Sequence, residues 1–235
     1  NSSSLGIEPI PKILLKQALP ASIGILVMSL NILVDTIFVG QWIGSIAIAA
    51  INVVLPVSFF IAALGMAIGI GGASIISRAL GSDNIKKARY TFANQITLTI
   101  LITVSFVLFG LYFIESIIPM FGGKGMIYEP SKIYYTIVLY GVPFLALSMM
   151  GNTVIRAEGK PKFAMYAMMI PSVTNLLFDY IFINIMDLGM TGAAWATTGS
   201  YILCFIFIFW FFISDNSEMK ALALHFKLKR SIVSE

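Results

Sequence analysis

Six long apolar stretches follow one another along the chain, separated by short segments rich in glycine and in charged or polar residues. Each stretch is long enough to cross the hydrocarbon core of a bilayer, which takes about 20 apolar residues in an α-helix. The separating segments carry residue types that interrupt helices and form turns. The pattern therefore predicts an all-α, polytopic membrane protein whose residues 1–213 form one lobe of transmembrane helices. The six helices are expected at about residues 13–39, 46–76, 90–114, 133–155, 163–185 and 193–213.

The composition agrees with a membrane protein and excludes an ordinary soluble domain. Of the 235 residues, 58% are hydrophobic and 11% are charged, whereas a typical soluble domain is about 25% charged. The net charge of +4 does not indicate a nucleic-acid partner, because the basic residues lie in short segments between apolar stretches. The single cysteine, Cys204, cannot form an internal disulfide and is expected to be a small buried apolar residue.

Lysine and arginine are divided very unequally between the two sides of the predicted membrane. Thirteen fall at the chain ends and in the second and fourth loops, whereas only Lys124 and Lys132 fall on the other side. Cytoplasmic segments of membrane proteins carry such an excess of basic residues. We therefore expect a multi-pass protein of the plasma membrane with both termini in the cytoplasm. The first apolar stretch is too long for the core of a signal peptide, so it is expected to be a mature helix.

Residues 214–235 are expected to form a basic cytoplasmic linker or tail. Their basic residues are mixed with apolar ones, which is typical of a segment that lies among lipid headgroups. An ordinary solvated linker explains the composition equally well. The only histidine, His225, lies here and is not expected to bind a ligand or to catalyse a reaction.

Two of the predicted helices repeat the same polar pattern. Asn31 and Asp35 lie four residues apart in the first helix, and Asn175 and Asp179 lie four residues apart in the fifth. This spacing places each pair on one face of its helix. Both helices run outward, and each carboxyl group is expected roughly 7–12 Å before the outer helix end, at a rise of about 1.5 Å per residue. Of the eleven acidic residues, only these two aspartates fall within helices.

Charged residues within a membrane are costly and are functional in most cases. We expect Asp35 and Asp179 to face the interior of the bundle or a water-filled cavity, together with Asn31 and Asn175. Such a group can take up a proton, or bind a small cation such as Na⁺ through its oxygen atoms. The alternative is a hydrogen-bonded clasp between two helices that has no part in transport.

Other residues of the predicted helices could contribute to the same site. Asn152 in the fourth helix and Thr197 in the sixth could join its polar network. Pro20 lies in the first helix about four turns before Asp35, and a proline inside a helix kinks it. It is either a hinge that moves Asp35 or a static kink. The glycines of Gly65-Met-Ala-Ile-Gly69 predict close packing of the second helix against a neighbour.

The sequence carries no catalytic set, so no enzymatic activity is expected. It has no cluster of histidine and cysteine for a catalytic metal, and no histidine within the membrane to activate a serine. An intramembrane aspartyl protease carries Gly-x-Gly-Asp at one aspartate, whereas the two aspartates here follow Ile-Leu-Val and Leu-Leu-Phe.

Several short motifs follow one another in a characteristic order over about residues 10–230. They are Pro20, Asp35-Thr-Ile-Phe-Val-Gly40, Gly69-Ile-Gly-Gly72, Ser77-Arg-Ala-Leu-Gly81, Arg156-Ala-Glu-Gly-Lys-Pro161, Asn175 with Asp179, and Gly192-Ala-Ala194. In this order and spacing the chain resembles the multidrug and toxic compound extrusion (MATE) family. The resemblance implies one lobe of a prokaryotic transporter with twelve helices in two six-helix lobes around a central cleft. Members export organic cations and other amphipathic compounds in exchange for H⁺ or Na⁺.

The resemblance is nearest to the branch of the DNA-damage-inducible transporters, in which this lobe carries the coupling site. It implies that the residues binding the coupling proton or Na⁺ are Asp35, Asn175 and Asp179. Asn152 and Thr197 would be supporting polar residues, and Pro20 would mark the bend of the first helix. No cofactor is implied apart from the coupling ion.

The expected partners are membrane lipids, small amphipathic or cationic substrates, and a second six-helix lobe. The second lobe is either the continuation of a longer chain or another copy in a parallel homodimer. Two other functions stay open. One is a transporter similar to the lipid-linked oligosaccharide flippases, and the other is a structural or channel-type subunit whose aspartate pair is only a packing clasp.

Overall fold

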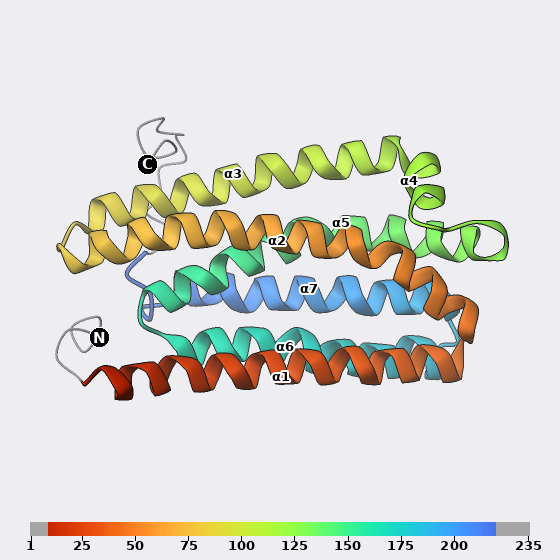
Figure 1. Cartoon of the computed structure of the whole chain (residues 1–235), viewed down its shortest axis with the longest axis horizontal. Helices are drawn as coiled ribbons and strands as arrows, with labels where there is room; N and C mark the ends of the chain where they lie inside the picture. The colour runs from red at the N-terminus through yellow and green to blue at the C-terminus, as the bar shows by residue number, and fades with distance from the viewer. Residues whose placement is uncertain (1–8, 220–235) are drawn as a thin grey trace.

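The computed structural model describes residues 9–219, and the regular secondary structure of these residues is helical (Figure 1). Six of the described helices are long and apolar enough to cross a membrane, which confirms the predicted fold class. Of the predicted tail, residues 220–235 with His225 lie outside the described part. The long helices are α1 (Ile10–Trp42), α2 (Ser45–Gly81), α3 (Ile85–Tyr112), α5 (Tyr128–Ala157), α6 (Pro161–Asp179) and α7 (Gly189–Ile213).

The structure also contains short elements that the apolar pattern does not reveal. A short helix, α4 (Ile114–Met120), and a 3₁₀ turn, η2 (Gly125–Ile127), connect α3 to α5. The fifth predicted helix, 163–185, is not uniform, because α6 changes into a π-helical segment, η3 (Tyr180–Ile185), directly after Asp179. Such wider turns are rare and are frequently found at functional sites.

Local sequence signals set where the helices begin and end. The side chain of Asn84 accepts a hydrogen bond of 3.0 Å from the backbone nitrogen of Lys87. This cap starts α3 at Ile85, five residues before the apolar pattern indicates. Pro161 occupies the first turn of α6, where its missing N–H is not needed. Gly159, with a φ of 74°, provides the left-handed turn that separates α5 from α6.

The six spans differ greatly in how firmly the lobe holds them. α5 is the central helix and packs against α2, α3, α6 and α7. α1 lies along one edge beside α6 (Figure 1) and contacts α2 much less. In the most apolar stretch of α1, 11% of the residues are buried. The corresponding share in the span that contains α5 is 56%. α1 is therefore attached to the lobe chiefly through one neighbour.

The buried apolar side chains form two clusters, one toward each end of the lobe. One cluster includes Val39, Ile51 and Tyr135. The other includes Phe92 and Phe212 and lies where the α2–α3 and α5–α6 turns meet. We call this second end the basic end, after its lysine and arginine residues Arg78, Lys86, Lys87, Arg89, Arg156, Lys160 and Lys162.

α2 and α5 approach each other closely at two glycines of α2. A Cβ atom at Gly65 would lie 2.5 Å from the carbonyl oxygen of Ala146, and one at Gly69 would lie 3.0 Å from the Cα atom of Met150. Membrane helices use small residues in this way to bring their backbones together. The close packing predicted for these glycines is therefore confirmed.

A second close approach joins α2 to α3. The side-chain nitrogen of Gln95 donates hydrogen bonds to the carbonyl oxygens of Ile68, at 2.7 Å, and Gly69, at 3.1 Å. The amide fills a notch at Gly72, where a Cβ atom would overlap it. α2 thus packs closely against two helices, α5 and α3.

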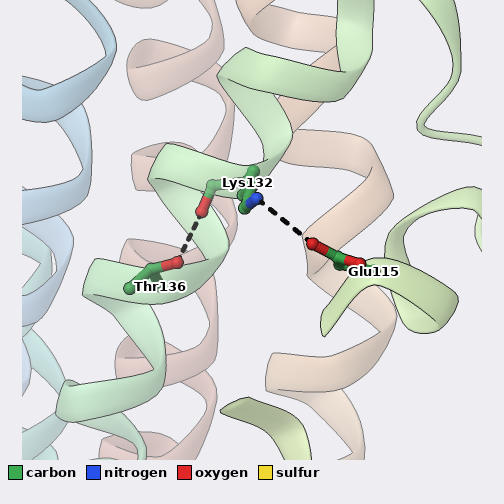
Figure 2. A network of polar contacts seen from close by, with 3 residues as sticks. All are labelled: Glu115, Lys132 and Thr136. Atoms are coloured by element: carbon green, nitrogen blue, oxygen red, sulfur yellow. Dashed lines mark hydrogen bonds and ion pairs between the residues drawn. The ribbon is translucent and has the colours of Figure 1, made fainter. Parts of the chain in front are cut away.

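At the end opposite the basic end, α4 and α5 are connected by one ion pair (Figure 2). Lys132 Nζ lies 3.9 Å from Glu115 Oε1. The Thr136 hydroxyl donates to the Lys132 carbonyl oxygen at 2.8 Å. The Glu115 side chain is 80% exposed, and ion pairs this exposed contribute little to stability. Glu115 therefore offers a control site at which a carboxylate is changed far from the basic end.

Gly65→Ala is expected to destabilise the lobe by about 1–3 kcal/mol, because the added methyl group meets backbone that cannot yield locally. Gly71→Ala is the matched control, since a Cβ atom there meets open space. The measurement is the melting temperature of both variants in detergent, with unfolding followed by tryptophan fluorescence. Equal melting temperatures for the two variants would contradict the close approach of α2 and α5.

Candidate functional site

A cavity of about 920 Å³ is lined by residues of α1, α2, α5, α6 and α7. It extends from Asp35 and Tyr134 to Arg156 at the basic end. Much of its wall is apolar, with polar side chains gathered at a few places. Its volume lies within the range of small-molecule sites, about 300–1,000 Å³, and so does its mixture of apolar surface with a few polar groups.

Two asparagines join α1 to α6 at the wall of this cavity. Asn31 Nδ2 donates a hydrogen bond of 2.9 Å to Asn175 Oδ1. Both side chains line the cavity. The structure therefore brings together the asparagines of the two repeated patterns, although the resemblance to a transporter family concerned Asn175 alone.

Asp35 and Asp179, one turn further along these helices, form what we call the carboxyl pair. The two groups are close enough to share a hydrogen bond when one of them holds a proton. Asp179 is 0% exposed, and neither of its oxygen atoms has a hydrogen-bond donor among the described residues. Asp35 is partly exposed and lines the cavity. Because like charges repel strongly in a low-dielectric interior, such a pair favours a shared proton or a bound cation.

Two tyrosines that the sequence did not single out lie beside the carboxyl pair. The Tyr134 hydroxyl is 3.0 Å from Thr197 Oγ1, and both residues line the cavity. Tyr134 and Tyr201 are near enough to Asp35 to interact with its charge. The structure thus places Thr197 in the predicted region. No sequence signal separates Tyr134 from its neighbour Tyr135, which is 2% exposed and does not line the cavity, although both belong to the same apolar cluster.

Asn152 lines the same cavity, but its hydrogen bonds are made to groups other than the carboxyl pair. Its Nδ2 atom donates to the carbonyl oxygen of Ala164 at 2.7 Å, and its Oδ1 atom accepts from Arg156 Nε at 3.1 Å. Arg156 also lies 3.1 Å from the sulfur atom of Met168. No carboxylate of the described residues forms an ion pair with Arg156. Asn152 therefore orients a cation at the basic end rather than supporting the pair directly.

Pro20 is buried within α1, which continues through it to Trp42. It lies eleven residues before Asn31, which is about 16 Å along a helix. It is not among the residues that line the cavity. Its role as a hinge stays a prediction.

The six spans and the cavity between them place the chain in the class of polytopic membrane proteins with an internal cavity. The MatE family profile matches residues 20–181, more than half of the chain. The chain belongs to the MATE family of transporters.

Relatives with assigned functions include a bacterial transporter and a bacterial multidrug export protein. The FAD transporter of Shewanella oneidensis is 30% identical over 199 residues, which are 83% of this chain and 44% of that protein. The multidrug export protein MepA of Staphylococcus aureus is 26% identical over 228 residues, which are 97% of this chain and 51% of that protein. The chain therefore spans about half the length of these relatives.

Solved structures of transporters also match this chain over about half of their own length. An outward-facing multidrug resistance MATE family transporter of the MOP superfamily is 29% identical with a TM-score of 0.86, and the match covers 95% of this chain and 49% of that one. A MOP superfamily transporter from Pyrococcus furiosus is 28% identical with a TM-score of 0.84, over 94% and 49% of the two chains. The six-helix lobe therefore has the fold of half of such a transporter.

The bond between α1 and α6 can be measured with a double-mutant cycle of Asn31→Leu and Asn175→Leu. We expect a coupling energy of about 0.6 kcal/mol and at most about 1.7 kcal/mol, as for other hydrogen bonds between membrane helices. The measurement is the free energy of unfolding in detergent micelles. As a control, Asn31→Leu should be additive with Thr198→Val, because the Thr198 hydroxyl bonds to the Ile137 carbonyl oxygen instead. Zero coupling between the asparagines would contradict the bond.

Proposed function

We propose that the chain is one six-helix lobe of a cation-coupled exporter and that the carboxyl pair binds the coupling ion. The supporting observation is the complete burial of Asp179 against Asp35 without a donor from the described residues. Burying a carboxylate without a partner costs roughly several kcal/mol of desolvation free energy. A proton or a cation supplies the missing partner. The complete transporter would need a second lobe, either the remainder of a longer chain or a second parallel copy.

Ion binding would act on the attachment of α1 to α6. The carboxyl pair and the Asn31–Asn175 bond both lie at this contact, and α1 has little other support. A bound proton or cation draws the two carboxyl groups together, whereas an empty pair repels. Two positions of α1 would thus differ in ion affinity, and binding would shift the population between them. A substrate that prefers one position must change the ion affinity by the same factor.

The available oxygen atoms suit either coupling ion. The carboxyl pair alone can hold a proton. Na⁺ would be bound by Asp35, Asp179 and the amide oxygen of Asn175. The described residues contain no group of three or more acidic, histidine or cysteine side chains, so the amide oxygen is needed for a third protein ligand. Na⁺ commonly has such neutral oxygen ligands beside carboxylates, as hard cations prefer oxygen.

Asp179→Asn in the full-length protein is expected to reduce gradient-driven efflux by at least about 10-fold, the size of a typical coupling between sites. The reason is that an amide cannot release a proton or neutralise Na⁺. The measurement is efflux of a fluorescent cation from proteoliposomes under an imposed H⁺ or Na⁺ gradient. Glu115→Gln serves as the control and should transport normally. Unchanged efflux with a lower melting temperature would instead identify the pair as a packing clasp.

A second candidate concerns the cargo. Arg156 borders the cavity at the basic end and has no carboxylate partner among the described residues. A guanidinium group in this setting suits a phosphate or a carboxylate. The FAD transporter named above is a relative whose cargo carries phosphate groups. A flippase for phosphate-linked lipids would present the same chemistry.

Arg156→Gln is expected to weaken transport of an anionic cargo while leaving a cationic one unaffected. Efflux of FAD and of ethidium would be compared in the same vesicles, with Lys162→Gln as the matched change of a nearby cation outside the cavity wall. We expect the loss for FAD to be about 10-fold, the usual cost of losing one charge-assisted hydrogen bond. Equal losses for both cargoes would assign Arg156 to folding or gating instead.

A further inference from the structure

The turn between α5 and α6 contains a buried carboxylate that the proposed function does not use. Glu158 is 5% exposed, and its side chain faces residues 214–219, which we call the exit segment because they follow α7. The Ser217 hydroxyl donates to Glu158 Oε1 at 2.7 Å, and the Glu218 backbone nitrogen donates to Oε2 at 3.4 Å. Both carboxyl oxygens are thus directed at one short piece of chain.

The exit segment is held at two further points. Met219 is 0% exposed and packs in the apolar cluster of the basic end. From α3, Arg89 Nε donates to the Glu218 carbonyl oxygen at 3.1 Å. Ser217 Oγ also accepts a hydrogen bond of 3.1 Å from the Met219 nitrogen. The hydroxyl group of Ser217 therefore links the carboxylate to the residue that is buried in the core.

We propose that Glu158 is a positioning residue that works as a proton-dependent catch on the exit segment. With a neutral carboxyl group the segment is held against the α5–α6 turn, and with an ionised one it is released. The exit segment is the connection from α7 to all residues that follow it, so the state of the catch decides how the lobe is joined to them. This inference does not depend on the carboxyl pair or on transport.

The surroundings of Glu158 determine the pH range over which the catch releases the exit segment. Burial raises the pKa of Glu158 from 4.5 to about 7, and the Glu218 carboxylate adds to this rise. The hydrogen bonds from Ser217 and from the Glu218 backbone, and the charge of Lys160, lower the pKa by less. Arg89 acts on the far side of the segment, through the Glu218 carbonyl oxygen.

The sign of the pH dependence follows from these values. A released Glu158 ionises near its ordinary pKa of 4.5, whereas the held one keeps its proton up to about 7. The catch is therefore at full strength below pH 4.5 and is lost as the pH rises through 7. The difference between the two pKa values favours release by up to about 300-fold at high pH.

The corresponding turn between α2 and α3 shows that a carboxylate is not needed for packing. Arg78-Ala-Leu-Gly81 resembles Arg156-Ala-Glu-Gly159 in sequence, and both end a long helix at the basic end. In the first turn the residue at the position of Glu158 is Leu80, which is 8% exposed and packs in the apolar cluster. An apolar residue can thus fill such a position without titrating. Glu158 adds the costly burial of an ionisable group, and with it sensitivity to pH.

The test measures mobility of the exit segment directly. A nitroxide label is attached at Asn216→Cys, which is exposed, in a Cys204→Ala background that removes the single thiol of these 235 residues. Electron paramagnetic resonance spectra are recorded from pH 4.5 to 9. The mobile fraction should be small at low pH and should rise with a midpoint near 7.

Two variants separate a proton-dependent catch from an ordinary contact. Glu158→Gln should keep the label immobile at every pH, because the amide stays neutral. Ser217→Ala should shift the rise in the mobile fraction to lower pH, because it removes a hydrogen bond that holds the segment. A contact with only a packing role would give no pH-dependent rise in the parent protein. Glu115→Gln, at the other end of the lobe, should titrate like the parent protein.

Three results would overturn the proposal. One is a mobile fraction of the parent protein that stays constant from pH 4.5 to 9. Another is a transition that persists unchanged in Glu158→Gln, since a different group would then be titrating. The last is a rise that stays at the same pH or moves to higher pH in Ser217→Ala, since the hydroxyl would then not help to hold the segment.

Discussion

Repulsion between two carboxyl groups in a medium of low dielectric constant is the constraint on which the rest of this lobe depends. Asp179 is withdrawn completely from solvent, and Asp35 meets it from another helix at the edge of the cavity. Asp179 cannot be stabilised by water as it would be on a soluble protein. In the proposed function, the pair would therefore make the contact between α1 and α6 sensitive to whatever neutralises it.

The remainder of the lobe divides into closely packed helices and one helix, α1, with fewer neighbours. α2 and α5 are brought together at Gly65 and Gly69, and Gln95 fixes α2 to α3. Of these helices, α2 and α5 contribute to the wall of the cavity. α1 packs mainly against α6, and α6 itself passes into a π-helical segment directly after Asp179. In the proposed function, a change of charge at the pair would thus act on a long helix that has few contacts apart from those with α6.

The sequence predicted the features that depend on local chemistry. Apolar stretches of sufficient length predicted the six spans, and the spacing of four residues predicted that Asn31 and Asp35 share a face, as Asn175 and Asp179 do. That the two asparagines bond to each other depends on how α1 lies against α6, and this was open until the fold was known.

Features that depend on the packing of distant segments could not be predicted. Tyr134 and Tyr135 are adjacent and alike, and only the position of α5 decides which of them faces the cavity. Asn152 was expected near the carboxyl pair, but the course of α5 carries it toward the basic end, where it bonds to Arg156. Glu158 resembled an ordinary charged turn residue, because the exit segment that buries it lies 59 residues further along the chain.

The most direct test of the central claim is infrared difference spectroscopy of the full-length protein in lipid. Spectra are recorded when the pH is lowered or Na⁺ is added, for the parent protein and for the double variant Asp35→Asn/Asp179→Asn. We expect a change in the carboxyl bands of the parent protein that is absent from the double variant. An equal change in both proteins would show that the coupling ion binds elsewhere and that the carboxyl pair is not its site.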